Sequence, residues 1–321
     1  MNIGRYELNN IYNEDCLEAM KQIPKNSIDI ILTDPPYLYL KNQKLDIPFD
    51  EDAVFNEFYR ILKPNGFVIL FGRGTSFYRW NTKISEIGFK FLEEIIWDKR
   101  NSSGAFLNLS RVHETISIHT KGNGKIIKSI VPYLEKKQYN LDGIIADVKR
   151  LSSYAKNEKN LDELKKFIIT KQIEFTQNKK TKFEITGKTI KCGNQGIYTA
   201  KSIITGMVES SIISVLKESY NFIHPTQKPI KLLERLLKII IEKYKTAIVL
   251  DPFAGSGSTV CACINLGLKY MAFELDKDYF ESANKRINDF KAQGNLFDII
   301  NTQPKIEQEN IFTSKIGEQN E

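Results

Sequence analysis

The sequence has few of the residues that stabilise secreted or metal-bound domains. Its 321 residues include only four cysteines, three histidines and two tryptophans. The cysteines show neither CxxC pairing nor a histidine at metal-ligand spacing, so no metal site is expected; they are Cys16, Cys192, Cys261 and Cys263. Reduced thiols in a cytoplasmic protein are the prediction that follows.

Long apolar runs and a leader-like N-terminus are also lacking. No run approaches the roughly 20 apolar residues that a membrane-spanning helix requires. The first five residues, Met1–Arg5, do not show the charged-then-apolar pattern of a signal peptide. The composition is that of a folded globular chain, since 41% of the residues are hydrophobic and 26% are charged. A membrane is therefore not expected among the partners.

The net charge of +7 is concentrated in one internal stretch. Residues 121–191 contain 17 lysines and arginines against 8 acidic residues, whereas the rest of the chain has 29 against 31. A segregated basic region is typical of a surface that contacts nucleic acid. A solvated, lysine-rich insertion would show the same pattern, so the charge alone leaves both interpretations open.

Three blocks and a polar tail follow one another along the chain. In residues 1–121, strands are expected near 27–33, 66–72, 89–97 and 114–119, and helices near 53–62 and 75–87. Residues 122–218 are polar, basic and weakly periodic. In residues 219–300, helices are expected near 229–244, 256–266 and 277–290, and strands near 247–250 and 270–274. Residues 301–321 form the polar tail.

The alternation of strands and helices predicts an α/β fold with a doubly wound, mostly parallel, Rossmann-like sheet. Neither 1–121 nor 219–300 has enough strands to form such a sheet alone. The two blocks are therefore expected to build one sheet together. Residues 122–218 are then an insertion, because a structureless loop of that length inside a domain would be unusual.

A glycine-containing turn lies between an expected strand and an expected helix. It consists of Asp251, Pro252, Phe253, Ala254, Gly255, Ser256, Gly257, Ser258 and Thr259. The two glycines let the backbone pass close to a ligand, and the hydroxyl residues that follow Gly255 could cap the helix. The turn is not a P-loop and lacks the third glycine of GxGxxG, so it does not choose between NAD and S-adenosylmethionine.

Glu274 ends the next expected strand, 19 residues after Gly255. A carboxylate at this point can accept hydrogen bonds from both hydroxyls of a ribose. Leu275 beside it could pack on an adenine ring. The spacing thus favours a nucleotide or nucleoside site over a turn that is merely structural.

Asp34-Pro35-Pro36-Tyr37 directly follows the strand expected near 27–33. The carboxyl ends of parallel strands are where α/β sheets place their ligands. An exocyclic amine is a poor nucleophile, and the Asp34 carboxylate and the Pro35 carbonyl could accept both of its hydrogens and stabilise the charge that develops during methyl transfer. Pro36 stiffens the turn, and Tyr37 offers a ring for stacking. An ordinary turn after a strand would contain the same residue types, so these four residues alone do not decide.

The Asp34 tetrapeptide and the Asp251 loop together resemble the DPPY and FxGxG signatures of the DNA amino-methyltransferases. The tetrapeptide comes first, a long variable region intervenes, and the loop comes last, which resembles the beta class of that family. The resemblance implies direct transfer of a methyl group from S-adenosylmethionine to an exocyclic amine of a base flipped out of double-stranded DNA. It also implies that 122–218 is the target-recognition region, whose lysines would hold phosphates.

Two further segments are similar to elements of this family. The segment His224-Pro225-Thr226-Gln227-Lys228-Pro229 resembles the element that closes over the methionine end of the cofactor, which implies that Thr226 and Lys228 bind its carboxylate. The segment Asn13-Glu14-Asp15-Cys16-Leu17 resembles the one at the cofactor's adenine, which implies that Asp15 takes the amino group and the Cys16 N–H a ring nitrogen. Without the resemblance, His224 would be a loop residue and Asp15 a helix cap.

The resemblance completes the predicted site. The catalytic residues are Asp34, Pro35, Pro36 and Tyr37; the cofactor-binding residues are Asp15, Cys16, Asp34, His224, Thr226, Lys228, Asp251–Thr259, Glu274 and Leu275. The segments Trp97-Asp98-Lys99 and His113-Glu114 resemble weaker family landmarks near the target base, with packing at strand ends as an equal alternative. No cysteine has the Pro-Cys setting of the cytosine-C5 enzymes.

The target and the partners are less fully determined. In the family, Asp at the head of the tetrapeptide favours adenine and Ser favours cytosine, so Asp34 favours N6 of adenine over N4 of cytosine. Transfer to RNA or to a protein amide is disfavoured by the basic insertion and the order of the elements, and a non-catalytic DNA-binding module is disfavoured by the intact site. The sequence leaves open a homodimer, a partner restriction endonuclease with a restriction–modification role, and the recognition sequence.

Overall fold

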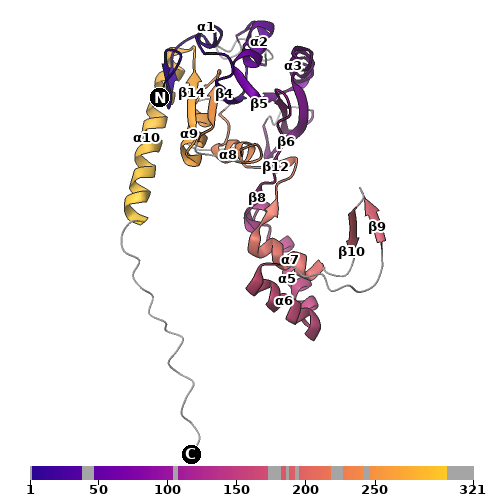
Figure 1. The fold of residues 1–321 in the computed structure, drawn as a ribbon. Helices are drawn as coiled ribbons and strands as arrows, with labels where there is room; N and C mark the ends of the chain where they lie inside the picture. The colour runs from indigo at the N-terminus through magenta and orange to yellow at the C-terminus, as the bar shows by residue number, and fades with distance from the viewer. Residues whose placement is uncertain are drawn as a thin grey trace, which may run out of the picture.

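A sheet of eight strands organises the upper part of the molecule in Figure 1. The computed structural model describes residues 2–37, 47–103, 108–172, 182–185, 188–191, 195–217, 227–241 and 246–301. The strand order is β12-β6-β7-β5-β4-β13-β14-β3. In chain order these are β3 (Asn10–Tyr12), β4 (Ile28–Thr33), β5 (Leu62–Gly72), β6 (Lys90–Ser103), β7 (Arg111–Thr120), β12 (Ile212–Ser214), β13 (Ile248–Asp251) and β14 (Lys269–Phe273).

Five neighbouring strands, from β5 to β3, run parallel to one another, and β7 is antiparallel to both β5 and β6. The prediction of a mostly parallel, doubly wound sheet is confirmed. β13, from the third block of the sequence, lies directly beside β4, from the first. The two blocks therefore build one sheet together, as the sequence predicts.

Helices cover both faces of this sheet. On one face lie α1 (Cys16–Lys21), α2 (Glu51–Ile61) and α3 (Gly74–Ile87); on the other lie α8 (Ile230–Lys238), α9 (Ser258–Leu266) and α10 (Lys277–Asn301). Alternate residues of β5 serve the two cores: Val68 and Leu70 pack with the first group of helices, and Ile69 and Phe71 with the second. Burial on both faces explains why the central strands read as continuous apolar runs.

Two helices differ in length from the prediction. The apolar pattern predicts a helix over 229–244, but α8 ends at Lys238, and Ile240 and Ile241 both donate their N–H to the carbonyl of Leu237 in a tight turn. These isoleucines are buried in the core although they are not helical, which is why the apolar spacing extends past the helix. Tyr244 lies outside the described residues. The second of these helices, α10, continues to Asn301, beyond the predicted end near residue 290.

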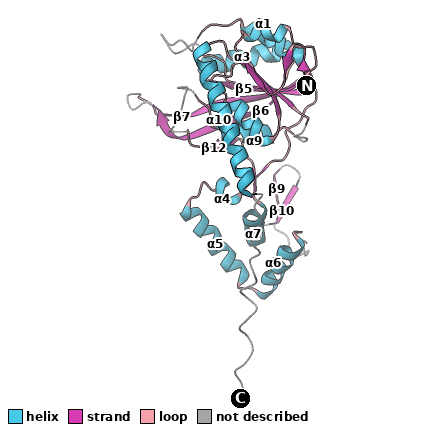
Figure 2. Ribbon diagram, turned by 90° about the vertical axis from the view of Figure 1, so that its left-hand side faces the viewer, coloured by secondary structure: helices cyan, strands magenta, loops and turns pink. Residues whose placement is uncertain are grey.

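The second block forms a separate helical part below the sheet (Figures 1 and 2). It contains α4 (Tyr133–Lys136), α5 (Leu141–Ala155), α6 (Glu158–Thr170), α7 (Gln195–Thr205), the pair β8 (Ile130–Val131) and β11 (Met207–Val208), and the hairpin of β9 (Lys182–Ile185) and β10 (Lys188–Lys191). A small core holds three of its helices together; it consists of Tyr154, Leu164, Phe167, Ile197 and Ala200.

The second block does not lie wholly apart from the sheet. β12, within the range 122–218 expected to be the insertion, is an edge strand of the main sheet and runs parallel to β6. A further short pair, β1 (Asn2–Ile3) with β2 (Tyr6–Glu7), precedes the sheet.

None of the helices in the described ranges combines the length and the apolar composition that a membrane span requires.

Gly196 at the start of α7 lets this helix approach α5 closely, because a Cβ at this position would overlap the side chain of Tyr154. We expect Gly196→Ala to lower the free energy of unfolding of the helical part by about 1–3 kcal/mol through overpacking. Limited proteolysis and thermal unfolding would measure this. Gly143→Ala in α5 is the matched control, since its Cβ would lie 3.5 Å from Asn140 Oδ1, an ordinary contact. Equal stability of the two variants would contradict the expectation.

Candidate active site

A cavity of about 680 Å³ opens at the carboxyl ends of β4 and β13. The chain leaves β4 towards β5 and leaves β13 towards β14, which lie on opposite sides, so the strand order reverses between these two strands. Open α/β sheets bind their ligands in the crevice at such a switch point. The Asp34 turn and the Asp251 loop both line the cavity. The two distant segments thus meet at one sheet edge, as the predicted chemistry requires.

Most of the predicted site residues surround this cavity. Those that line it are Asp15, Cys16, Asp34, Pro35, Pro36, Tyr37, Lys228, Asp251, Pro252, Phe253, Ala254, Gly255, Ser256, Ser258, Thr259, Glu274 and Leu275. Gly257 is not among them; it has a φ of 71°, and a Cβ there would lie 3.0 Å from Ile287 Cδ1 of α10. His224 and Thr226 lie outside the described residues.

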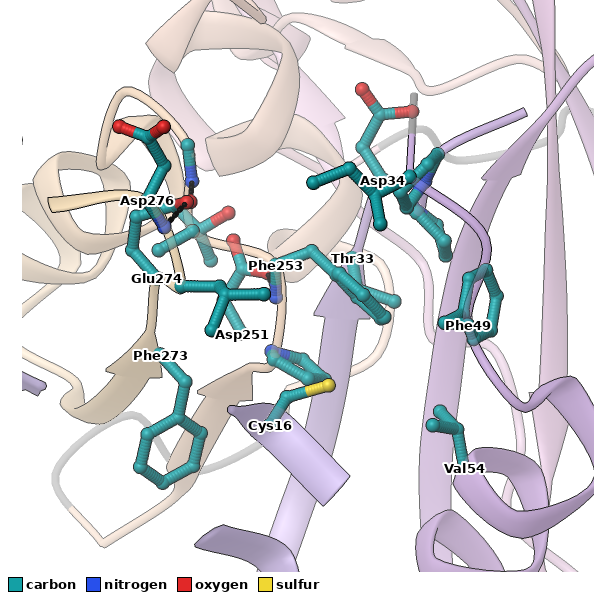
Figure 3. Close-up of a pocket in the computed structure, with 18 of the residues that line it drawn as sticks. Cys16, Thr33, Asp34, Phe49, Val54, Asp251, Phe253, Phe273, Glu274 and Asp276 are labelled. Carbon is teal, nitrogen blue, oxygen red and sulfur yellow. Dashed lines mark hydrogen bonds between the residues drawn. The ribbon is translucent and has the colours of Figure 1, made fainter. Parts of the chain in front are cut away.

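Glu274 fixes the glycine loop against the end of β14. Its Oε2 accepts a hydrogen bond from the Gly255 N–H at 2.7 Å, and its Oε1 accepts one from the Asp276 N–H at 2.9 Å. The Ala254 N–H also donates to the Phe273 carbonyl at 2.8 Å. Burial raises the pKa of Glu274 above its ordinary value. Figure 3 shows Glu274 and Asp34 on opposite sides of the cavity, with Asp251 and Phe253 between them.

The helix after the loop begins without the side-chain cap that the sequence suggests. Gly257 is the N-cap residue of α9 and makes no side-chain bond to the helix. Ser256 Oγ instead lies 3.0 Å from Ser258 Oγ, and Arg286 Nη1 donates to both the Ser256 carbonyl and Ser258 Oγ at 2.9 Å. The serines therefore tie the loop to α10 rather than cap α9.

The N-terminal side of the cavity is held by two side chains. Asp15 Oδ1 accepts hydrogen bonds from the N–H groups of Leu17 and Glu18, so it caps α1 while it also lines the cavity. Asn13 Nδ2 donates to the carbonyls of Glu274 and Leu275, both at 2.9 Å. Sequence reasoning gave Asn13 no role, because its partners lie about 260 residues further along the chain.

Cys16 is a buried thiol in the wall of the cavity. Burial raises its pKa to about 12, so the thiol stays protonated at neutral pH. A protonated thiol is a poor nucleophile. Cys16 itself is therefore unsuited to nucleophilic attack at neutral pH.

Asp34 is the centre of a charged cluster. Its Oδ1 accepts a hydrogen bond from the Tyr37 hydroxyl and its Oδ2 accepts one from Lys228 Nζ. The same ammonium lies 3.3 Å from Glu114 Oε2, and Lys99 Nζ lies 2.5 Å from Glu114 Oε1. Two carboxylates and two ammonium groups thus lie together in a largely buried setting.

The pKa directions follow from this arrangement. Burial raises the pKa of Asp34, while the Lys228 ammonium opposes that shift. Burial disfavours the charge on Lys228, but the carboxylates of Asp34 and Glu114 together raise its pKa above the ordinary value. Burial likewise works against the charge on Glu114, but Lys228 and Lys99 hold the pKa of Glu114 below its ordinary value. Lys228 therefore stays protonated, and positively charged, at neutral pH.

The structure separates the weaker landmarks by role. Lys99 and Glu114 belong to the Asp34 cluster. Trp97 Nε1 donates to the Val215 carbonyl at 2.8 Å, and Asp98 Oδ2 accepts from Ser214 Oγ at 2.7 Å, so these two residues hold the β12 segment instead. The sequence could not distinguish them, because both pairs lie at the same strand ends.

Aromatic side chains line the part of the cavity near the Asp34 turn. Tyr37 packs on Trp80 with ring centroids 5.9 Å apart, and its carbonyl accepts a hydrogen bond from Ser76 Oγ at 2.8 Å. Phe49 packs on Phe253 with ring centroids 5.1 Å apart. Sequence reasoning missed Phe49, which lines the cavity from a stretch without a motif.

No group of metal-ligating side chains occurs in the part of the chain that is described.

A family comparison extends over most of the chain. A family model described as DNA methylase matches residues 28–285. The Type II methyltransferase M.HinfI of Haemophilus influenzae is 25% identical over 323 residues, which cover 93% of this chain and 73% of that protein. The Type II methyltransferase M.HpaI of Haemophilus parainfluenzae is 26% identical over 304 residues, which cover 91% of this chain and 77% of that protein.

Solved structures share the fold. The M1.HpyAVI–SAM complex superposes with a TM-score of 0.51 at 21% identity, covering 86% of this chain and 98% of that chain. The PvuII DNA methyltransferase, which is cytosine-N4-specific, superposes with a TM-score of 0.53 at 14% identity, covering 91% of this chain and 96% of that chain. At these identities the likeness concerns the fold alone.

Asp251 provides a test of how deeply the cavity carboxylates are buried. Its Oδ1 accepts from the Phe253 N–H at 3.1 Å, and burial raises its pKa to about 7. Between about pH 4 and 7 the folded protein keeps a proton that the unfolded chain has lost, so stability falls as the pH rises through this window. The contribution is at most about 4 kcal/mol and does not change above that window.

We expect Asp251→Asn to remove this part of the pH dependence. Urea unfolding of the unliganded protein at several pH values between 5 and 8 would show a smaller decline for the variant than for the native chain. The matched control is Asp52→Asn, because Asp52 is exposed on α2. Parallel stability curves for Asp251→Asn and the native chain would contradict the expectation.

Proposed function

The chain belongs to the DNA methylase family, and on this basis we propose that it transfers a methyl group from S-adenosylmethionine to N6 of adenine in double-stranded DNA. The observation that supports this proposal is the meeting of the Asp34 turn and the Gly255 loop around one cavity at the β4–β13 switch point. The Asp34 turn offers acceptors for an amine, and the Gly255 loop offers a binding surface for a nucleoside cofactor.

The residues of the cavity fit S-adenosylmethionine. Glu274 holds the loop through one hydrogen bond to each carboxylate oxygen, which leaves a second lone pair on each oxygen for ribose hydroxyls. Leu275 and Phe253 supply apolar surface for a planar base. A volume of about 680 Å³ lies within the range of small-molecule sites. The structure of M1.HpyAVI in complex with SAM supports the same cofactor.

The chain's own residues would bind and orient the amine. When bound, the cofactor supplies an electrophilic methyl group on a sulfonium. Asp34 and the Pro35 carbonyl would accept the two amine hydrogens and favour a pyramidal nitrogen aligned with the methyl group. Transfer of the methyl group from sulfur to nitrogen would place positive charge on the nitrogen, and the Asp34 carboxylate would stabilise that charge. That carboxylate can then hold the proton that the methylated nitrogen releases.

Asp34 is also the basis for choosing adenine. The family trend associates Asp at this position with adenine, whereas the fold is shared with a cytosine-N4-specific enzyme and does not discriminate. The relatives M.HinfI and M.HpaI are named Type II methyltransferases, which supports site-specific DNA methylation in a restriction–modification setting.

The helical part, with its excess of lysine and arginine, is proposed to bind and read the DNA. Its basic charge suits phosphates, and phosphate contacts give affinity without sequence information. A homodimer, a partner restriction endonuclease and a cytoplasmic location stay predictions. The assignment of Lys228 to the cofactor carboxylate also stays a prediction; in this structure its ammonium donates to Asp34 and lies 3.3 Å from Glu114 Oε2.

We expect Asp34→Ala to lower kcat by at least about 10²-fold, because the variant loses the acceptor that stabilises the reacting amine. Cofactor affinity should be largely retained, since the loop and Glu274 are untouched. Incorporation of labelled methyl groups into DNA and equilibrium binding of the cofactor would measure the two effects. Asp52→Ala on the exposed face of α2 is the control. Unchanged turnover of Asp34→Ala would refute the role assigned to this carboxylate.

The acceptor base is tested separately. Labelled cofactor incubated with DNA, RNA and protein pools should label DNA, and digestion of that DNA to nucleosides should release N6-methyladenine. N4-methylcytosine would overturn the choice of base alone. Label confined to RNA or protein would overturn DNA as the substrate.

A further inference from the structure

Lys228 occupies the place that the proposed function gives to the substrate. Its ammonium donates to Asp34 Oδ2, one of the oxygens expected to accept an amine hydrogen of the base. It also lies over the rings of Phe71 and Tyr37, at 5.0 and 5.9 Å from their centroids. Lys228 is 7% exposed, so this is an internal cation rather than a surface side chain. A base that docks on Asp34 must therefore displace it.

A second position for the ammonium lies next to the first. Glu114 Oε2 is buried, lies 3.3 Å from Lys228 Nζ, and makes no hydrogen bond within the described part of the chain. The other oxygen of Glu114 is paired with Lys99. A buried carboxylate oxygen without a hydrogen bond is costly, and one short movement of Lys228 would satisfy it. The lysine thus has two acceptors and is fully engaged with only one.

The charges make this movement possible at little electrostatic cost. When both carboxylates are ionised, Asp34 and Glu114 carry two negative charges, and Lys99 and Lys228 carry two positive charges, so the cluster is then balanced. Moving Lys228 from Asp34 towards Glu114 keeps every charge within the cluster. Removing the lysine altogether would leave a buried carboxylate without its cation, which is strongly unfavourable.

We propose that Lys228 is a displaceable internal occupant of the amine site, and that Glu114 is the positioning residue that receives it when the target base docks on Asp34. The inference rests on the proposed function, because it identifies the docking group as a neutral exocyclic amine. In the free protein the lysine donates to Asp34 Oδ2 and opposes the protonation that burial of this carboxyl favours. When the base arrives, the amine takes over Asp34, and the ammonium forms its hydrogen bond with Glu114.

The first test is Glu114→Gln, which replaces the receiving carboxylate by a neutral amide. We expect kcat/KM for DNA to fall about tenfold or more, the effect of weakening one hydrogen bond to a charged group. Cofactor affinity should stay unchanged, because Glu114 is not among the residues that line the cavity. Glu94→Gln is the matched control, since Glu94 is exposed in the same β6–β7 ladder. Native kcat/KM for Glu114→Gln would overturn the inference.

The second test uses the pH profile, which a purely structural role would not change in this way. In Lys228→Met, Asp34 loses its cation, and burial then favours its protonated form. We expect kcat/KM for DNA to be low at neutral pH and to rise about tenfold per pH unit until Asp34 ionises. Lys228→Arg, which keeps the charge, should restore the native profile. Identical profiles for Lys228→Met and the native chain would overturn the inference.

Other charged groups face this cluster and are kept constant in both tests. Tyr37 and Asp251 face Asp34, whereas Lys99 and Lys217 interact with Glu114. All four are present in every variant, and Asp251, whose pKa lies near 7, titrates within the same pH range in the native chain and in the variants.

A double-mutant cycle separates this inference from the proposed function. Glu114→Gln should lower Tm less in the Lys228→Met background than in the native one, because the lysine shared with Asp34 is then absent. Equal losses in the two backgrounds would overturn the sharing of Lys228, whatever the substrate is. Conversely, coupling in this cycle with methylation confined to RNA or protein would leave the shared lysine in place and refute only DNA as the substrate.

Discussion

The parallel pairing of β4 with β13 is the contact on which the site depends. Ile30 pairs with Val249 and Ile31 with Leu250, although more than 200 residues separate them in the sequence. The Asp29 side chain reinforces this pairing, since its Oδ2 accepts hydrogen bonds from the Ile248 N–H and from Lys63 Nζ. Both strands end at the same edge of the sheet. Their pairing alone therefore brings the Asp34 turn and the Asp251 loop to one cavity.

Much of the sheet could be predicted because its strands are buried on both faces. The apolar runs of β4, β13 and β14 and the turn residues after them mark strand ends that the structure reproduces closely. The helical part was harder to predict, since α5 leaves apolar residues such as Ile145 and Val148 exposed. Its helix starts were detectable in retrospect: Asn140 caps α5 and Asn157 caps α6 through their side chains. The strand β12 lies in a run rich in β-branched residues, 211–216, which was not assigned to a strand because it falls inside the polar second block.

The site shows the same division between local and long-range information. The Asp34 turn and the Gly255 loop are contiguous in sequence, so their chemistry could be predicted from residue types and spacing. The charged neighbours of Asp34 could not, because Lys228, just before α8, and Glu114, in β7, come near it only through the fold. Asp15 shows that two interpretations can both hold, since the residue caps α1 and lines the cavity. Predictions from motifs thus identified the functional groups but not the charge balance between them.

Among the residues that the structure describes, the core of the helical part shares no side chain with the two cores of the sheet. Substitutions that repack Phe167 or Leu164 are therefore not transmitted through packing to the strands that carry Asp34 and Glu274. Under the proposed function, the part that binds DNA can therefore change in evolution independently of the part that transfers the methyl group. Lineages of such a chain can change the DNA sequence they mark by altering one core and its surface, while the chemistry of transfer is inherited intact.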